Sequence, residues 1–183
     1  MEYEKLQDLF WDASLLLAGD LLTSPADQHI RWKYPTNGQP DWKIDDNILF
    51  LFLSEQEDDY GKQVDTTREE EDGSVTLKRT RTRVWYLLLT AYGPKACEIV
   101  NQIKDGVFRQ DAKKLLQDAK KLLADGSVFL VPDLPVCQNA PELYAGKWWN
   151  RWDLTLHFNE LYSLPDEDAG HIDSVAVTGK AEG

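Results

Sequence analysis

The sequence has few of the features that mark a membrane, secreted or metal-binding protein. No apolar run approaches the roughly 18 residues that a membrane-spanning helix needs, and the first ten residues lack the basic-then-apolar order of a signal peptide. Only two cysteines occur, Cys97 and Cys137, and neither has the spacing of a metal site or a redox motif. We therefore predict two reduced thiols in a cytosolic protein, with no membrane partner.

Positive charge is also scarce. The 183 residues contain 20 Lys and Arg against 32 Asp and Glu, which gives a formal net charge of −12. A surface that grips nucleic acid needs clustered basic side chains to replace counterions, so this composition argues against DNA or RNA binding. An acidic protein can still lie beside DNA when the DNA must slide past without sticking.

Catalytic motifs are missing as well. The three histidines, His29, His157 and His171, are scattered, and His157 and Glu160 fall on opposite faces of a predicted strand. No phosphate-binding glycine-rich loop, nucleophile elbow or Cys/His pair is present. We predict a protein that is not an enzyme and holds no metal or cofactor. Its many carboxylates and seven tryptophans leave a carbohydrate-binding module or glycosidase as one alternative. A monomeric adaptor domain is a second alternative.

The hydrophobic pattern predicts an α+β fold. The predicted architecture is a mainly antiparallel β-sheet that is flanked by an N-terminal helix and a central helical segment and carries an extended β-hairpin arm. Residues 48–53 form an unbroken apolar run that is typical of a central strand covered on both faces. Gly93-Pro94 precedes a second helix, with Pro94 at its first position. The predicted apolar stripe of this helix is Ala96, Ile99, Val100, Ile103 and Val107. The first helix is expected to end between Gly19 and Thr23, with Pro25 behind it. Its predicted apolar stripe repeats at three-and-four spacing: Leu6, Leu9, Phe10, Ala13, Leu16, Leu17 and Leu21.

An aromatic stretch near the C-terminus alternates with period two from Trp148 onward, as in a strand with one buried and one polar face. The predicted buried face holds Trp148, Trp152, Leu154, Leu156 and Phe158. The predicted polar face holds Trp149, Arg151 and Asp153, which we take as candidate subunit-interface residues.

A very long strand is predicted from residue 74 to residue 91. At about 3.3 Å per residue it would span roughly 60 Å, far more than the usual strand of about 20 Å. Either a bulge bends it or its polar half projects as an arm, from about residue 56 to residue 83. One face of this arm carries three further candidate interface residues: Arg79, Arg81 and Arg83. Acidic residues precede them and are candidates to face a lumen or a partner ring: Asp58, Asp59, Glu69, Glu70, Glu71 and Asp72.

A collinear set of short motifs between residues 28 and 160 resembles the neck and tail terminator proteins of tailed bacteriophages. The motifs are IRW at 30–32, YPTNGQP at 34–40, DYG at 59–61, RVW at 83–85, YGP at 92–94, FLVPD at 129–133, PEL at 141–143, WWNRWDL at 148–154 and FNE at 158–160. A repeat at 111–116 and 118–123 and the acidic run at 69–72 have no place in that pattern.

The resemblance implies a structural virion protein rather than an enzyme. Such proteins form a homohexameric ring that caps the tail tube and joins it to the head connector or stopper. The implied partners are other copies of the chain, the tail tube protein and the head connector, with the tail sheath as a further candidate. DNA passes through without specific binding. The implied location is the virion neck, after assembly in the host cytoplasm. We expect one domain over residues 1–183, with a polar C-terminal extension at 164–183. Within that extension, only residues 172–178 have the pattern of a short edge strand.

Overall fold

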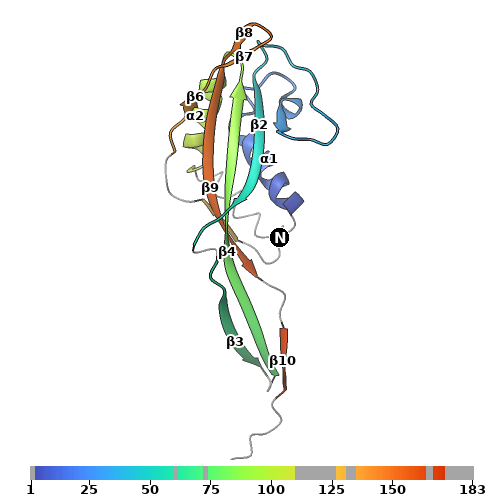
Figure 1. Ribbon diagram of the computed structural model, residues 1–183, viewed down its shortest axis with the longest axis vertical. Helices are drawn as coiled ribbons and strands as arrows, with labels where there is room; N and C mark the ends of the chain where they lie inside the picture. The colour runs from blue at the N-terminus through green and yellow to red at the C-terminus, as the bar shows by residue number, and fades with distance from the viewer. Residues whose placement is uncertain are drawn as a thin grey trace, which may run out of the picture.

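A computed structural model describes residues 3–59, 62–71, 74–109, 127–130, 135–163 and 167–171, and it has the predicted α+β fold (Figure 1). Two α-helices, α1 (Tyr3–Ala18) and α2 (Ala96–Gly106), and one 3-10 turn, η1 (Ala26–Gln28), occur in these ranges. The rest of the regular structure in these ranges is β-strand, and most strand pairs are antiparallel.

The main sheet has the central strand order β1-β2-β4-β9-β5. Its members are β1 (Ile30–Trp32), β2 (Ile48–Gln56), β4 (Ser74–Tyr92), β9 (Arg151–Ser163) and β5 (Ser127–Leu130). Only β1 and β2 pair in parallel among the strand pairs of the described chain. Three shorter strands join the sheet: β3 (Asp65–Glu71) and β10 (Glu167–His171) pair with β4, and β6 (Gln138–Asn139) pairs with β9.

The hydrophobic core lies between the two helices and one face of the sheet, which we call the helix face. Alternate residues of β2, β4 and β9 contribute to it, for example Leu51, Leu89 and Leu154, which are directly paired across the three strands. Phe10 of α1 packs on Phe158 of β9 with ring centroids 4.6 Å apart. The predicted stripe of α2 is buried at every position: Ala96, Ile99, Val100, Ile103 and Val107.

The long strand β4 runs from the body of the molecule into a narrow arm (Figure 1). Its C-terminal half lies between β2 and β9, and its N-terminal half pairs with β3 and β10. The register between β4 and β9 is continuous from Thr80 to Tyr92, so no bulge bends the strand there. Of the two sequence-based alternatives, the projecting arm is therefore the one that the fold adopts.

Both helices differ in detail from the prediction. Leu16 was assigned to the apolar stripe but is 53% exposed, while Trp11 and Leu15, outside that stripe, pack partly against the core. The reason is that the buried face of α1 is rotated toward Ser14 and Ala18, which are buried, and away from Leu16. Helix α2 begins at Ala96 with Lys95 as its N-cap, so Pro94 precedes the helix rather than opening it.

The alternating aromatic stretch is not one strand, which corrects the prediction. Residues Lys147–Trp149 form β8, which pairs with β7 (Glu142–Tyr144) in a separate hairpin turned by Ala145 and Gly146, both at positive φ. Asn150 lies between β8 and β9, and its side chain donates to the Gly93 carbonyl at 2.8 Å. Trp148 is consequently 67% exposed, and Trp152 is only partly buried against the core.

The C-terminal region also differs from expectation. The strand β10, residues Glu167–His171, pairs with the arm, although the sequence suggested an edge strand only at residues 172–178. Residues 172–178, the repeat at 111–123, Asp72 and residues 131–133 lie outside the described residues. Strand β5 contains Phe129 and Leu130, the first two residues of the FLVPD motif, and pairs with β9.

Candidate functional site

The face of the sheet opposite the helices carries the candidate polar residues, and we call it the open face. Successive side chains of a strand alternate between faces, so the register places three of them in one row: Phe50 of β2, Thr90 of β4 and Asp153 of β9. The next row holds Ile48, Tyr92 and Arg151. Aromatic and charged residues are therefore interleaved on this face. Figure 1 shows that the hairpin strands β7 and β8 lie at the end of the molecule opposite the arm strands β3 and β10.

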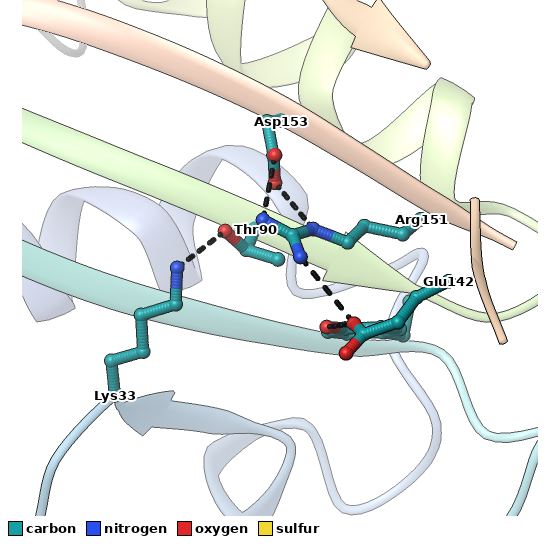
Figure 2. Close-up of polar contacts among 6 residues, drawn as sticks. Lys33, Thr90, Glu142, Arg151 and Asp153 are labelled. Atoms are coloured by element: carbon teal, nitrogen blue, oxygen red, sulfur yellow. Dashed lines mark hydrogen bonds and ion pairs between the residues drawn. The ribbon is translucent and has the colours of Figure 1, made fainter. Parts of the chain in front are cut away.

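A charged network crosses the open face (Figure 2). The Arg151 guanidinium donates to both carboxylate oxygens of Asp153, from Nε at 3.1 Å and from Nη2 at 2.8 Å. Arg151 Nη1 reaches Glu142 Oε2 at 3.4 Å, and the Tyr92 hydroxyl donates to the same oxygen at 2.7 Å. Lys33 donates from Nζ to the Thr90 hydroxyl at 3.2 Å. The predicted neighbours Arg151 and Asp153 are thus in direct contact.

The network shifts the pKa values of its members. The hydrogen bonds to Asp153 raise the pKa of Arg151 above its usual value, and this outweighs the lowering by burial. Burial, reinforced by the hydrogen bond to Glu142, raises the pKa of Tyr92 well above its ordinary range. Burial and the nearby Arg151 charge lower the pKa of Lys33, opposed by Asp153 and Glu142. The phenol of Tyr92 therefore stays neutral at physiological pH.

Beside the network lies a pocket of about 370 Å³, lined by Asp41, Trp42, Tyr92, Glu142, Tyr144 and Trp149. Its aromatic rings contact one another edge to face: Trp42 and Trp149 have centroids 6.0 Å apart, and Tyr144 and Trp149 have centroids 6.2 Å apart. Trp42 also packs on Phe50 of the sheet at 5.1 Å. This arrangement fixes the β7-β8 hairpin over the end of the sheet and presents aromatic faces beside carboxylates.

The three arm arginines lie on the helix face, away from the pocket. Arg83 is paired within its own chain. Its guanidinium makes a bidentate contact with the Glu160 carboxylate, with Nε–Oε2 and Nη2–Oε1 both at 2.9 Å. Glu160 also accepts a hydrogen bond from Trp85 Nε1 at 2.7 Å. The Arg81 guanidinium carbon lies 5.6 Å from the centroid of the Tyr162 ring, a looser contact. Arg83 therefore anchors the base of the arm, which makes it a poor candidate for a subunit contact.

The candidate acidic residues are spread along the arm. Glu69, Glu70 and Glu71 occupy β3 opposite Thr76, Val75 and Ser74 of β4. Asp59 is exposed and lies 3.4 Å from Lys62, whereas Asp58 is half-buried. These residues do not come together with the open-face network, so the candidates form two separate groups.

Several residues of the open-face site were not singled out from the sequence: Lys33, Trp42, Thr90, Tyr92 and Glu142. The Ala145-Gly146 step before Lys147 is the signal that could have shown the hairpin and hence the approach of Glu142 to Arg151. Another unexpected contact links the two cysteines. Asn101 donates to Cys97 Sγ at 3.4 Å and accepts from Cys137 Sγ at 3.5 Å, and burial raises the pKa of the Cys137 thiol.

Neither a metal-binding cluster nor a membrane-spanning helix is found within the described residues. No group of three or more His, Cys, Asp or Glu side chains lies close enough together to hold a metal ion in this part of the chain. No helix within the same residues is long and apolar enough to cross a membrane.

Comparison with known proteins decides the family. The sequence model of a family described as phage neck terminator proteins matches residues 4–183, which is nearly the whole chain. The chain belongs to the phage neck terminator family. A search of curated proteins finds no significant match.

A neck terminator is a structural protein of the virion, and its contacts are made with other virion components. In this fold, most of the motifs that carry the resemblance supply contacts at one of two places, the base of the arm and the open face. RVW at 83–85 and FNE at 158–160 supply the buried contact at the base of the arm. YGP at 92–94, PEL at 141–143 and WWNRWDL at 148–154 supply the open-face network and its pocket.

Proposed function

We propose that this chain forms a homohexameric ring that caps the tail tube and joins it to the head connector, leaving a channel for DNA. The observation that carries this proposal is the family match over residues 4–183. The role is structural rather than catalytic. The protein would assemble in the host cytoplasm and remain in the neck of the virion, in contact with the tube protein and the connector.

The shape of the subunit supports a ring. A closed ring needs a heterologous interface, in which one surface of each subunit meets a different surface of the next. The chain offers two distinct surfaces: the open face around Trp149, Arg151 and Asp153, and the arm with Arg79 and Arg81. An isolated monomer gains little from an ordered arm, because ordering each residue costs about 1–2 kcal/mol of backbone entropy.

The charge of the subunit supports a conduit for DNA. With a net charge of −12, the chain would repel the phosphate backbone over most of its surface. The acidic strand β3, with Glu69, Glu70 and Glu71, is our candidate for a segment that faces the lumen or the adjacent ring. Such a lining would let DNA slide through without specific binding.

The experiment is a deletion of the gene for this chain in the phage, followed by electron microscopy of the lysate. A protein that ends the tube and joins it to the head is needed only for the last step. We therefore expect DNA-filled heads beside separate tails, some of them longer than normal. Intact infectious particles would contradict the proposal. Heads that never fill would place the protein at a different step of assembly.

A further inference from the structure

The aromatic pocket of the open face has hydrogen-bond donors without acceptors and carboxylates that are exposed to solvent. The indole N–H groups of Trp42 and Trp149 are buried, and within the described residues they have no hydrogen-bond partner. A buried donor without an acceptor costs about 1–3 kcal/mol, and a ligand that supplied an acceptor would remove that cost. Glu142 stands at the same pocket with its side chain 48% exposed, and Asp41 beside it is also exposed.

This chemistry selects a particular kind of ligand. Aromatic faces beside carboxylates favour a cation, because the ring quadrupole and the negative charges both attract it. The two indole N–H groups require acceptors, which a guanidinium or ammonium group does not have. A basic side chain carried on a peptide backbone satisfies both requirements, since the backbone supplies carbonyl oxygens.

The chain carries a matching basic surface on its own arm. Arg81 lies on β4 in a looser contact than Arg83, and its Nε is buried without a hydrogen-bond partner within the described residues. Arg79 is two residues away on the same face. The net charge of −12 makes copies of the chain repel one another, and a local pairing of opposite charges at a contact would offset that repulsion.

The geometry excludes contact between this pocket and these arginines within one chain. Tyr92 lines the pocket at one end of β4, and Arg81 lies eleven residues earlier on the same unbroken strand. At about 3.3 Å per residue the two are roughly 35 Å apart. The pocket is on the open face, whereas the arginines are on the helix face, so one subunit can use both surfaces at once with two different neighbours.

We propose that the pocket lined by Trp42, Tyr92, Glu142 and Tyr144 receives Arg81 or Arg79 from the arm of a neighbouring copy. Glu142 and Asp41 pair with the guanidinium, and carbonyl oxygens of the incoming strand accept from the two indoles. This inference rests on the proposed ring and names the contact that closes it. It adds residues to the interface that the sequence did not suggest.

Cross-linking tests the contact directly. In a Cys97→Ser/Cys137→Ser background, Glu142→Cys and Arg81→Cys are introduced together and treated with a short bis-maleimide. Because the two positions are far apart in one chain, any cross-link joins two copies. The matched control replaces Lys78 instead of Arg81, since Lys78 is an exposed cation on the same strand but on the opposite face. We expect a ladder of cross-linked copies from the 142/81 pair and none from the 142/78 pair.

The outcomes separate this inference from the proposed ring. If rings are seen by electron microscopy but the 142/81 pair does not cross-link more than the control, the pocket contact is wrong and the ring stands. If the product stops at two copies and no rings are seen, the pocket contact stands and the ring is wrong. If there are neither rings nor cross-links, both are overturned.

A charge exchange provides a second measurement that does not depend on the engineered cysteines. Glu142→Arg and Arg81→Glu, each alone, place like charges at every contact and should raise the concentration needed for assembly by at least about tenfold. Mixed in equal amounts, the two variants pair opposite charges again and should assemble. Glu98→Arg mixed with Lys78→Glu is the control, because both residues are exposed and outside the contact. If mixing does not restore assembly, the proposed contact is wrong.

Discussion

The ion pair between Arg83 and Glu160 at the base of the arm allows a quantitative test, because its removal should lower the free energy of unfolding by a predictable amount. Glu160 is fully buried, and the Arg83 side chain is 14% exposed. Three hydrogen bonds converge on the Glu160 carboxylate, two from Arg83 and one from Trp85. Removing one member leaves the other charge buried without compensation, which typically costs about 3–5 kcal/mol. We expect that cost for Arg83→Ala and for Glu160→Ala.

Further variants separate charge from shape. Glu160→Gln keeps an acceptor for Trp85 but loses the charge, and we expect a loss of about 1.5–3 kcal/mol, the usual worth of hydrogen bonds to a charged group. The double variant Arg83→Leu/Glu160→Leu removes both charges together. It should cost less than the sum of the single changes, because the main remaining penalty is the unsatisfied Trp85 N–H, about 1–3 kcal/mol.

The assay is urea denaturation followed by tryptophan fluorescence and circular dichroism, and the free energy of unfolding is compared between the wild type and the four variants. An exposed ion pair on the same protein serves as the control: Lys62 lies 2.8 Å from Glu57, with side chains 57% and 82% exposed. Lys62→Ala should change stability by no more than about 0.5 kcal/mol. If Arg83→Ala and Glu160→Ala are as mild as Lys62→Ala, the reasoning about the buried pair is refuted.

Three further predictions follow from the packing, the open-face network and the arm. Phe158→Ala should destabilise by about 3–5 kcal/mol, whereas Trp148→Ala, at an exposed position, should stay within about 0.5 kcal/mol; equal shifts in thermal melting would contradict the assignment of faces. Because the folded pKa of Tyr92 is raised, its neutral phenol contributes stability that is complete below pH of about 10 and is lost as pH rises further; wild-type protein should lose stability above pH of about 10 faster than Tyr92→Phe, and parallel curves from pH-dependent denaturation would refute this. Replacing residues 57–72 by a short Gly/Ser turn should leave a folded subunit by circular dichroism but impair assembly by electron microscopy, and normal joined particles would show that the arm is dispensable.

The elements governed by local periodicity were predictable from the sequence. The three-and-four spacing of α2 places every predicted apolar residue in the core, because a helix with one buried face leaves little freedom at those positions. The six-residue apolar run was sufficient to predict β2 as a central strand, because so short a run between polar residues fits a strand better than a helix. The strand pattern of β4 was long enough to predict a strand far longer than usual.

The site was only partly predictable, because it depends on contacts distant in sequence. Arg151 and Asp153 were expected as neighbours, since residues two apart share a strand face. Their approach to Glu142, Tyr92 and Lys33 depends on a hairpin that ends at Asn150 and on the order of the strands. The alternation of aromatic residues continues across that hairpin boundary, so period two alone assigned Trp148 to the wrong surface.

The same limit explains Arg83. From the sequence it is one of three equivalent arginines on one face of the arm. The pairing of β4 with β9 places Arg83 opposite Glu160, which turns one of the three into a structural anchor. Arg79 and Arg81 lie further out along the arm and remain our candidates for contact with a neighbouring copy.

The central claim is that copies of this chain form a ring between the end of the tail tube and the head connector. A cryo-electron microscopy reconstruction of the neck of the intact virion tests it most directly. We predict a sixfold ring at that junction into which this subunit fits, with the open-face pocket of each copy against the arm of the next and a central channel for DNA. A junction without such a ring, or density for this chain at another place in the particle, would contradict the claim.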